Sequence, residues 1–223
     1  MATVVLADDH ALVRVGLRRV LESEGHRVLS EVGDGLHVVA VVDRTHPDVL
    51  LLDLGLPGMH GLDVLREVTR QVPGTKVLIV SAYNRDEFVV SALRQGASGY
   101  VLKGAEAEDL LTAVAEVARG GYYVSPPLAV SLAKGVNGAE PAPPDPYDNL
   151  STRERQVLLL MAEGLANCDV GVHLYISTRT AETHRASVMR KLGLKSQTDV
   201  VLYALRRGIL SLDDAGGAPR HDT

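Results

Sequence analysis

Residues 49–61 read VLLLDLGLPGMHG, and this stretch decides the fold. Its first four residues are apolar, and a short apolar run closed by turn residues is typical of a strand buried on both faces of a parallel sheet. Pro57, Gly58 and Gly61 then break the strand and begin a loop. Asp53 is therefore predicted at the carboxyl end of a buried strand, where open α/β sheets bind their ligands.

Asp53 on its own could merely cap the following turn, but other apolar runs of the chain end in the same way. These runs are 4–7 before Asp8 and Asp9, 77–80 before Ser81, and 100–102 before Lys103. Parallel strands bring their carboxyl ends to one edge of a sheet. We therefore expect three carboxylates, one hydroxyl and one ammonium group to meet at that edge.

Helical periodicity fills the gaps between these strands. Apolar residues recur at helical spacing after each apolar run, and glycine or proline closes most of the resulting helices. The five expected strands are 3–7, 28–29, 49–52, 76–80 and 99–102. Strands that alternate with helices in this way predict an α/β fold with a five-stranded, doubly wound parallel sheet.

The side chains expected at this edge suit phosphoryl transfer. Clustered carboxylates repel one another unless a cation lies among them, and hard oxygen ligands suit Mg²⁺. An aspartate such as Asp53 can act as a nucleophile and form an aspartyl phosphate. Ser81 and Lys103 could then neutralise the charge on the transferred group. In the alternative interpretation, Lys103 is only a structural counter-ion for the acidic side chains.

With these positions in place, residues 3–120 resemble the receiver domain of two-component response regulators. The resemblance implies a flavodoxin-like fold in which Asp53 is the phosphoacceptor and a sensor histidine kinase is the donor. It also implies that Ser81 and Lys103 hold the phosphoryl group, and that Tyr100 is the aromatic residue that changes rotamer on activation.

The same resemblance implies a Mg²⁺ site. Its ligands would be the carboxylates of Asp8, Asp9 and Asp53 and the backbone carbonyl of Gly55. Two residues depart from the pattern of the family. His60 stands where an acidic or amide residue is common, and Gly104 follows the lysine where Asp or Pro is frequent.

The composition fits a cytoplasmic globular protein. Of 223 residues, 46% are hydrophobic and 23% are charged, which is ordinary for soluble domains. The single cysteine, Cys168, excludes an intrachain disulfide and a Cys-based zinc site, and an inert thiol is favoured over a redox role for it. No apolar run approaches the roughly 20 residues that span a bilayer, and no signal peptide opens the chain, so no membrane association is expected.

A proline-rich segment divides the chain into two domains. The expected parts are a receiver domain (1–121), a linker with one short helix (122–148), a second domain (149–210) and a disordered tail (211–223). Residues 1–135 hold 13 Lys/Arg against 17 Asp/Glu, a net charge of −4, whereas residues 148–210 hold 9 against 6, a net charge of +3. A basic second domain hints at nucleic acid.

The second domain is predicted to contain four short helices. Ser151 and Glu154 form a capping box at the start of the first helix. Ser177 caps a longer helix that Gly193 stops, and a tight turn at Tyr175-Ile176 precedes it. Four short helices, two of them joined by a tight turn, predict a small all-α helix-turn-helix domain.

Residues 150–207 closely resemble the LuxR-type DNA-binding domain in its NarL/FixJ response-regulator setting. The match rests on LSTRERQVL, AEGLAN, TRTAETHR and MRKLGL. The resemblance implies binding to double-stranded promoter DNA as a homodimer formed on phosphorylation, with RNA polymerase as a further partner. By resemblance, Glu182, Thr183 and Ala186 face the base edges, and Arg179, Thr180, Arg185 and Lys191 approach the DNA backbone.

Several positions of the second domain bear on how it binds and dimerises. In the last helix, Val200, Val201 and Ala204 offer a dimer surface, although part of that stripe must pack inward. Departures from the family are Cys168-Asp169 in place of Lys-Glu, Gly171 in place of a common alanine, and Gln197 in place of a frequent arginine. We therefore expect DNA binding to be weak without dimerisation or phosphorylation.

Two other functions fit parts of the sequence. A haloacid-dehalogenase-type phosphatase also forms an aspartyl phosphate, but it needs a second Asp two positions after the nucleophile, where this chain has Gly55. A receiver whose output domain binds a protein instead of DNA would fit the departures in the second domain. The favoured interpretation is a phosphorylation-controlled transcription regulator and not an enzyme.

Overall fold

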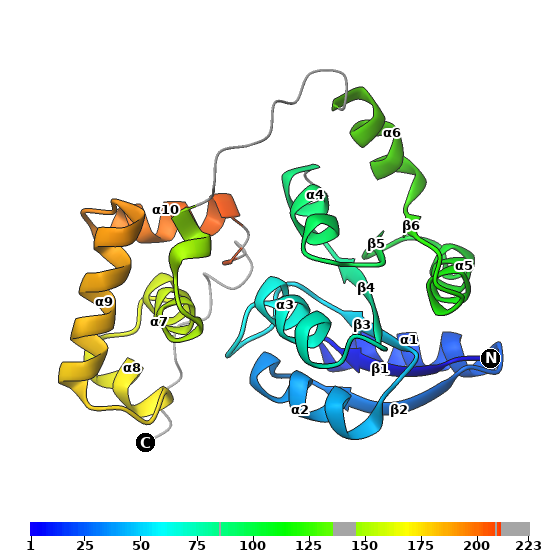
Figure 1. Cartoon of the computed structure of the whole chain (residues 1–223), viewed down its shortest axis with the longest axis horizontal. Coiled ribbons are helices and arrows are strands. Elements are labelled where there is room, and N and C mark those ends of the chain that lie inside the picture. Colours follow the sequence, from blue (N-terminus) through cyan, green and yellow to red (C-terminus); the bar gives the residue numbers. More distant parts are fainter. Residues whose placement is uncertain (85, 136–145, 208, 211–223) are drawn as a thin grey trace. The chain divides into compact units, whose positions relative to one another are not determined.

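The computed structural model describes residues 1–84, 86–135, 146–207 and 209–210. The chain divides into two compact units, Met1–Glu140 and Pro141–Thr223 (Figure 1). The tail predicted to be disordered and most of the proline-rich segment lie outside the described residues.

The first unit is built on one parallel sheet with the strand order β2-β1-β3-β4-β5-β6. The strands are β1 (Thr3–Ala7), β2 (Arg27–Val32), β3 (Val49–Leu52), β4 (Lys76–Ser81), β5 (Gly99–Leu102) and β6 (Tyr123–Val124). The helices are α1 (Ala11–Ser23), α2 (Gly35–Thr45), α3 (Gly61–Gln71), α4 (Asp86–Arg94), α5 (Ala107–Ala118) and α6 (Pro126–Gly135). The doubly wound parallel fold expected from the sequence is confirmed.

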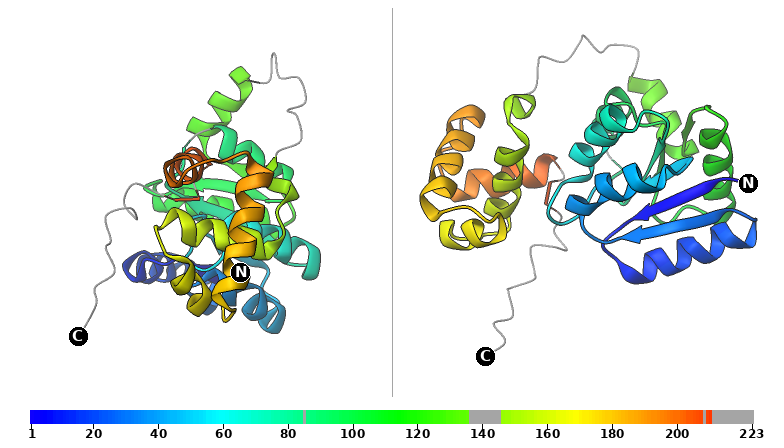
Figure 2. Two further views of the ribbon diagram at one scale, coloured as in Figure 1. Left: turned by 90° about the vertical axis from the view of Figure 1, so that its left-hand side faces the viewer. Right: turned by 60° about the horizontal axis from the view of Figure 1, so that its bottom comes forward.

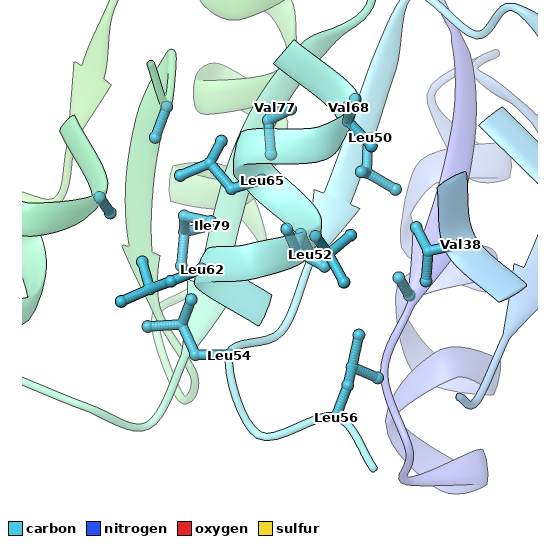
Figure 3. Packing of buried hydrophobic residues seen from close by; sticks show 14 of the residues in the cluster. Val38, Leu50, Leu52, Leu54, Leu56, Leu62, Leu65, Val68, Val77 and Ile79 are labelled. Carbon is cyan, nitrogen blue, oxygen red and sulfur yellow. The ribbon is translucent and has the colours of Figure 1, made fainter. Parts of the chain in front are cut away.

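Helices cover both faces of the sheet (Figure 2), which explains why its strands are apolar throughout. Along β3, Val49 and Leu51 belong to the core shared with α1 and α5, whereas Leu50 and Leu52 belong to the core shared with α2 and α3. Figure 3 shows Leu50 beside Val68 of α3. Because successive side chains of a strand point to opposite faces, this one apolar run contributes to two cores.

The sheet has six strands and not the five predicted. The sixth strand, β6, pairs in parallel with β5, with Tyr123 opposite Gly99 and Val124 opposite Tyr100. Two residues are too few to show an alternating pattern, so no strand is apparent there in the sequence. β6 lies in the segment predicted to be a linker, and Leu128 of the following helix is buried in the core. The first residues of that segment therefore belong to the sheet and its covering layer.

The second unit is a bundle of short helices. It contains the 3₁₀ helix η1 (Pro146–Asn149) and the helices α7 (Thr152–Ala162), α8 (Asn167–His173), α9 (Thr178–Leu192) and α10 (Gln197–Arg207). The predicted capping box is present, because Ser151 Oγ accepts from the Glu154 N–H and the Glu154 carboxylate accepts from the Ser151 N–H. No helix in the described parts of the chain is both long and apolar enough to cross a membrane.

Packing in the core of the second unit buries one face of α10 and leaves the other exposed to solvent. Met161 of α7 and Val188 of α9 belong to one buried cluster with Val200 and Ala204 of α10. Val200 and Ala204 are fully buried, so these two residues are the part of the predicted dimer stripe that packs inward, whereas Val201 is only partly buried. Val200 and Ala204 lie at helical spacing on one face of α10 and pack into the core of the second unit. Leu202, which is 45% exposed, is an apolar side chain of α10 that reaches solvent.

Gly61 allows α3 to start directly against the end of β3. A β-carbon at this position would lie 2.3 Å from the carbonyl oxygen of Asp53, so the helix start would have to move. We expect Gly61→Ala to lower the free energy of unfolding by about 1 to 2 kcal/mol. Urea denaturation of the full chain measures this change.

The matched control is Gly16→Ala in the exposed part of α1. A β-carbon on Gly16 would meet nothing within 4 Å. Because alanine favours a helix interior over glycine, this substitution should raise the free energy of unfolding by up to about 1 kcal/mol. Changes of the same sign in the two variants would contradict the packing at Gly61.

Candidate functional site

The carboxyl ends of four strands place the candidate site residues at one edge of the sheet. β1 and β3 stay paired to their last residues, so Asp8 and Asp53 follow neighbouring strand ends. The Asp53 N–H donates to the Ala7 carbonyl (2.8 Å), and the Lys103 N–H donates to the Ser81 carbonyl (2.8 Å). These backbone hydrogen bonds fix the points at which the side chains leave the sheet.

Asp53 lies at the centre of this edge and is only 5% exposed. Its Oδ1 accepts a hydrogen bond from the Leu54 N–H (2.7 Å), and its Oδ2 accepts one from the Lys103 ammonium (2.7 Å). The same ammonium lies 2.8 Å from Asp8 Oδ2. Lys103 therefore bridges the two buried carboxylates, and the Asp53 carboxylate is held in one orientation.

The charges of this cluster follow from burial and pairing. Burial raises the pKa of the Asp53 carboxyl above its usual value, against the opposing effect of Lys103. Burial alone would lower the pKa of the Lys103 ammonium, but the carboxylates of Asp53 and Asp8 outweigh it and hold that pKa above its usual value. Lys103 is thus a positive charge at neutral pH beside a poorly hydrated carboxylate.

The acidic cluster fits a divalent cation. Ligand atoms of Asp8, Asp9, His10 and Asp53 all lie within 4.8 Å of one another. Two buried oxygens of the cluster, Asp8 Oδ2 and Asp9 Oδ1, are paired within the described chain only with Lys103 Nζ (2.8 Å) and His10 Nδ1 (2.6 Å), respectively. Carboxylate oxygens gathered this closely are suited to a hard cation such as Mg²⁺.

Two neighbours of the acidic cluster were not predicted from the sequence. His10 Nδ1 lies 2.6 Å from Asp9 Oδ1. Arg14 Nη1 donates to the backbone carbonyl of Asp8, while its Nε donates to Glu31 of β2 (3.3 Å). Arg14 therefore ties the loop after β1 to the next strand. A cation on α1 soon after an acidic pair is the sequence signal that could have found it.

Ser81 and Tyr100 are linked through the backbone of Tyr83. Ser81 Oγ accepts from the Tyr83 N–H (3.4 Å), and the Tyr100 hydroxyl donates to the Tyr83 carbonyl (2.7 Å). Both side chains are fully buried, and burial raises the pKa of the Tyr100 phenol. The Tyr83 ring lies 5.1 Å from the ring of Phe88 in α4, measured between centroids. A displacement of Ser81 would therefore alter the contacts that Tyr83 makes with Tyr100 and with α4.

The glycines and the histidine around the site have local structural roles. A β-carbon on Gly55 would lie 3.6 Å from Asp53 Oδ2, an ordinary van der Waals contact, so the Gly55 backbone lies beside the carboxylate without crowding it. His60 caps α3, since its Nδ1 accepts from the Leu62 N–H (3.3 Å). Gly104 has a φ of 94°, which few other residues adopt. The two departures from the receiver pattern, His60 and Gly104, thus suit their own positions.

One face of α9 is exposed and polar, and the opposite face is buried. Ala181 and Val188 pack into the core of the second unit. Residues predicted to contact DNA that are exposed on this helix are Arg179, Thr180, Glu182, Thr183 and Ala186. The Thr183 hydroxyl donates to the Arg179 carbonyl within the helix (2.9 Å). The exposed face carries a basic, an acidic and two hydroxyl side chains, which is the mixture that reads phosphates and base edges.

The two remaining predicted DNA contacts are held by other helices. Arg185 is half-buried, and its Nη2 donates to Gln197 Oε1 (2.7 Å) at the start of α10. Lys191 Nζ donates to Glu154 Oε2 (2.7 Å) and to the Asn149 carbonyl (3.0 Å), and its side chain is 32% exposed. Lys191 therefore has a structural role in the second unit that the sequence did not reveal.

The chain matches two known domain families in the order of its two units. Residues 4–115 match the response regulator receiver domain, and residues 148–204 match the bacterial regulatory proteins of the luxR family. The oxygen regulatory protein NreC of Staphylococcus carnosus is 38% identical over 213 residues, which cover 93% of this chain and 98% of NreC.

Solved structures agree with this assignment. A LuxR-family two-component response regulator from Aurantimonas sp. SI85-9A1 is similar with a TM-score of 0.60 and 31% identity, covering 62% of this chain and 99% of its own. The two-component response regulator RcsB, solved as a complex with DNA, is similar with a TM-score of 0.57 and 27% identity, covering 91% of this chain and 96% of RcsB.

Proposed function

Because the chain belongs to the response regulators that join a receiver domain to a LuxR-type DNA-binding domain, and so regulates transcription in a two-component system, we propose that Asp53 accepts the phosphoryl group from its sensor histidine kinase. The observation that carries this proposal is the environment of Asp53. Its buried carboxylate is oriented by Lys103 beside a second buried carboxylate, Asp8, at the carboxyl end of β3.

In the proposed transfer, a carboxylate oxygen of Asp53 attacks the phosphorus of the phosphohistidine on the kinase. A phosphorus–oxygen bond forms as the phosphorus–nitrogen bond breaks, and the histidine nitrogen leaves with the bonding electrons. The Lys103 ammonium and the Ser81 hydroxyl bind the phosphoryl oxygens. Asp8, Asp9, Asp53 and the Gly55 carbonyl would hold Mg²⁺, which when bound neutralises charge on the phosphoryl oxygens.

Phosphorylation is proposed to act on Tyr100 through Ser81. When the Ser81 hydroxyl turns to the phosphoryl group, the Tyr83 N–H loses its acceptor, and the contact between Tyr83 and Tyr100 is loosened. A two-state element needs contacts that differ between its states. Here the differing contacts are the hydrogen bonds of Ser81 and Tyr100 to the Tyr83 backbone.

For the second unit we propose that α9 enters the major groove of promoter DNA. Glu182, Thr183 and Ala186 would face base edges, and Arg179, Thr180, Arg185 and Lys191 would approach the backbone. Arg185 donates to the neutral side chain of Gln197, so its positive charge is not paired with a carboxylate there. Lys191, in contrast, can reach a phosphate only by giving up its hydrogen bonds to Glu154 or Asn149. Lys191 is accordingly the weakest contact of the set.

One short helix reads few base pairs, so useful specificity requires two copies of the domain. We therefore propose that the phosphorylated protein binds two half-sites as a homodimer. RNA polymerase is the proposed partner at the promoter, and the cytoplasm is the proposed location.

The proposed DNA binding is tested by selecting duplex DNA from a random library with protein that has or has not been treated with acetyl phosphate and Mg²⁺. Treated protein should bind more tightly, and log K should fall linearly with log salt. Arg185→Ala should weaken binding to every sequence and lower the salt slope by about one unit, since one phosphate contact is lost. Glu182→Ala should instead change the preferred half-site.

Arg119→Ala is the charge-matched control for Arg185→Ala, because Arg119 is an exposed arginine at the C-cap of α5 in the first unit. It should leave the salt slope unchanged. If Arg185→Ala changed the sequence preference while Glu182→Ala did not, the assigned orientation of α9 would be wrong. If neither state of the protein bound duplex DNA, the output domain would have to act on a protein partner, the second candidate function.

A further inference from the structure

Tyr175 occupies the turn between α8 and α9 in an unusual conformation. Its φ is 54°, in the left-handed region, and its side chain is 96% exposed. The other non-glycine residue with a positive φ in the described chain is His46, which closes α2. The turn itself is held by the backbone, because the Tyr175 N–H donates to the Val172 carbonyl (3.2 Å) and the Ile176 N–H donates to the Gly171 carbonyl (2.9 Å).

The fold gains nothing from a tyrosine at this position. A left-handed backbone is unfavourable for a residue with a bulky side chain, and glycine or asparagine would adopt it at a lower cost. The exposed ring contributes no burial in return. Strain at an exposed aromatic residue is therefore better explained by a contact outside the domain than by stability.

We propose that Tyr175 is a DNA contact that flanks α9, with its ring against a deoxyribose and its phenol donating a hydrogen bond to a backbone phosphate. This inference rests on the proposed DNA binding of α9. Tyr175 precedes Ser177, the N-cap of α9, by two residues, and exposed Thr178, Arg179 and Thr180 begin that helix. The turn thus joins directly to the surface proposed to approach phosphates.

The chemistry of the turn favours this partner. A tyrosine has an apolar ring and a polar tip, and tyrosine hydroxyls are among the groups that bind DNA phosphates. Val172, whose carbonyl accepts the Tyr175 N–H, is also largely exposed at 74% and adds apolar surface at the end of α8, just before the turn. An amphipathic side chain in the turn, four positions before the exposed Arg179, suits a sugar–phosphate strand.

The test compares full-length Tyr175→Asn and Tyr175→Phe with the wild type in DNA affinity and in urea denaturation. Tyr175→Asn should raise the urea midpoint, because asparagine adopts the left-handed region more readily, yet should bind the selected DNA about 10-fold more weakly. Tyr175→Phe keeps the ring and should lose part of that affinity. The salt slope should stay unchanged in both variants, because a phenol carries no charge.

Tyr122→Asn is the matched control, since Tyr122 is an exposed tyrosine of the first unit, and it should leave DNA affinity unchanged. Wild-type affinity in Tyr175→Asn would overturn the inference while leaving the proposed function intact. A joint loss of stability and affinity in that variant would also overturn it, because the ring would then serve the fold. A wild type that fails to bind duplex DNA in either phosphorylation state would overturn the proposed function itself, and this inference with it.

Discussion

Asp53→Asn should abolish the phosphorylation of this protein by acetyl phosphate. The amide cannot replace the carboxylate as the nucleophile, and it removes the negative charge that Lys103 now neutralises. Mass spectrometry of the intact chain should show one added phosphoryl group on the wild type and none on the variant. Excess EDTA should prevent the reaction of the wild type, because three clustered carboxylates offer the site for the required cation.

Asp34→Asn is the matched control for this experiment. Asp34 caps α2 by accepting a hydrogen bond from the Leu36 N–H, and asparagine is an equally good N-cap. The control variant should therefore fold normally and accept one phosphoryl group. Equal labelling of Asp53→Asn, or labelling of the wild type in excess EDTA, would show that the site works in another way.

Glu154→Ala should destabilise the second unit by about 3 kcal/mol, the lower end of the range for breaking a buried ion pair. Glu154 is 5% exposed, and its carboxylate accepts from Lys191, from the Ser187 hydroxyl (2.7 Å) and from the Ser151 N–H (2.7 Å). The loss stays at the lower end because Lys191 is 32% exposed and can be hydrated. Urea denaturation followed by far-ultraviolet circular dichroism measures the change.

The same group makes stability depend on pH in the acid range. Burial alone would raise the pKa of Glu154, but Lys191, Ser151 and Ser187 outweigh it and lower that pKa from 4.5 to about 2. Because the folded value lies below the unfolded one, the contribution is fully present above pH 4.5 and is lost as the pH falls through about 2. Glu154→Ala should therefore flatten the fall in stability between these values.

Glu182→Ala is the control for Glu154→Ala, because it removes a glutamate from the exposed face of α9. Its stability should stay within about 0.5 kcal/mol of the wild type. If Glu154→Ala unfolded at the same urea concentration as this control, the pair of Glu154 and Lys191 would have no structural role.

The parts of the fold that follow from local patterns could be predicted from the sequence. β3 is predicted at 49–52 and spans Val49–Leu52, because a four-residue apolar run between turn residues has the length of a buried strand and is too short for a helix. The meeting of Asp8, Asp53 and Lys103 follows from topology alone, since parallel strands end at a common edge.

Contacts between distant residues could not be predicted in this way. In the sequence, Lys191 is one more basic residue of α9. Only the packing of α7 against α9 shows that its ammonium pairs with the carboxylate of Glu154, 37 positions away. Tyr83 likewise has no sequence signal for its two bonds to Ser81 and Tyr100. β6 was missed because two residues cannot display a period.

Gly171, which stands in place of a common alanine, has a packing role in α8. Glycine in a helix interior costs roughly 1 kcal/mol relative to alanine, so its place there needs a structural reason. A β-carbon there would lie 2.9 Å from the Ile176 carbonyl, so the glycine allows α8 to approach the turn before α9. Cys168 in the same helix is an exposed free thiol.

The short strand β6 also determines how mechanical load would enter the first unit. The chain leaves the sheet through β6 and α6, so tension transmitted along the segment after α6 acts first on these two elements. β6 is fastened to β5 by hydrogen bonds from the Tyr123 N–H to the Ser98 carbonyl (3.2 Å) and from the Ser125 N–H to the Tyr100 carbonyl (2.9 Å). The Tyr100 carbonyl, three residues before Lys103, therefore helps to hold β6, so the strand that carries the proposed switch residue also anchors the point at which the chain leaves the sheet.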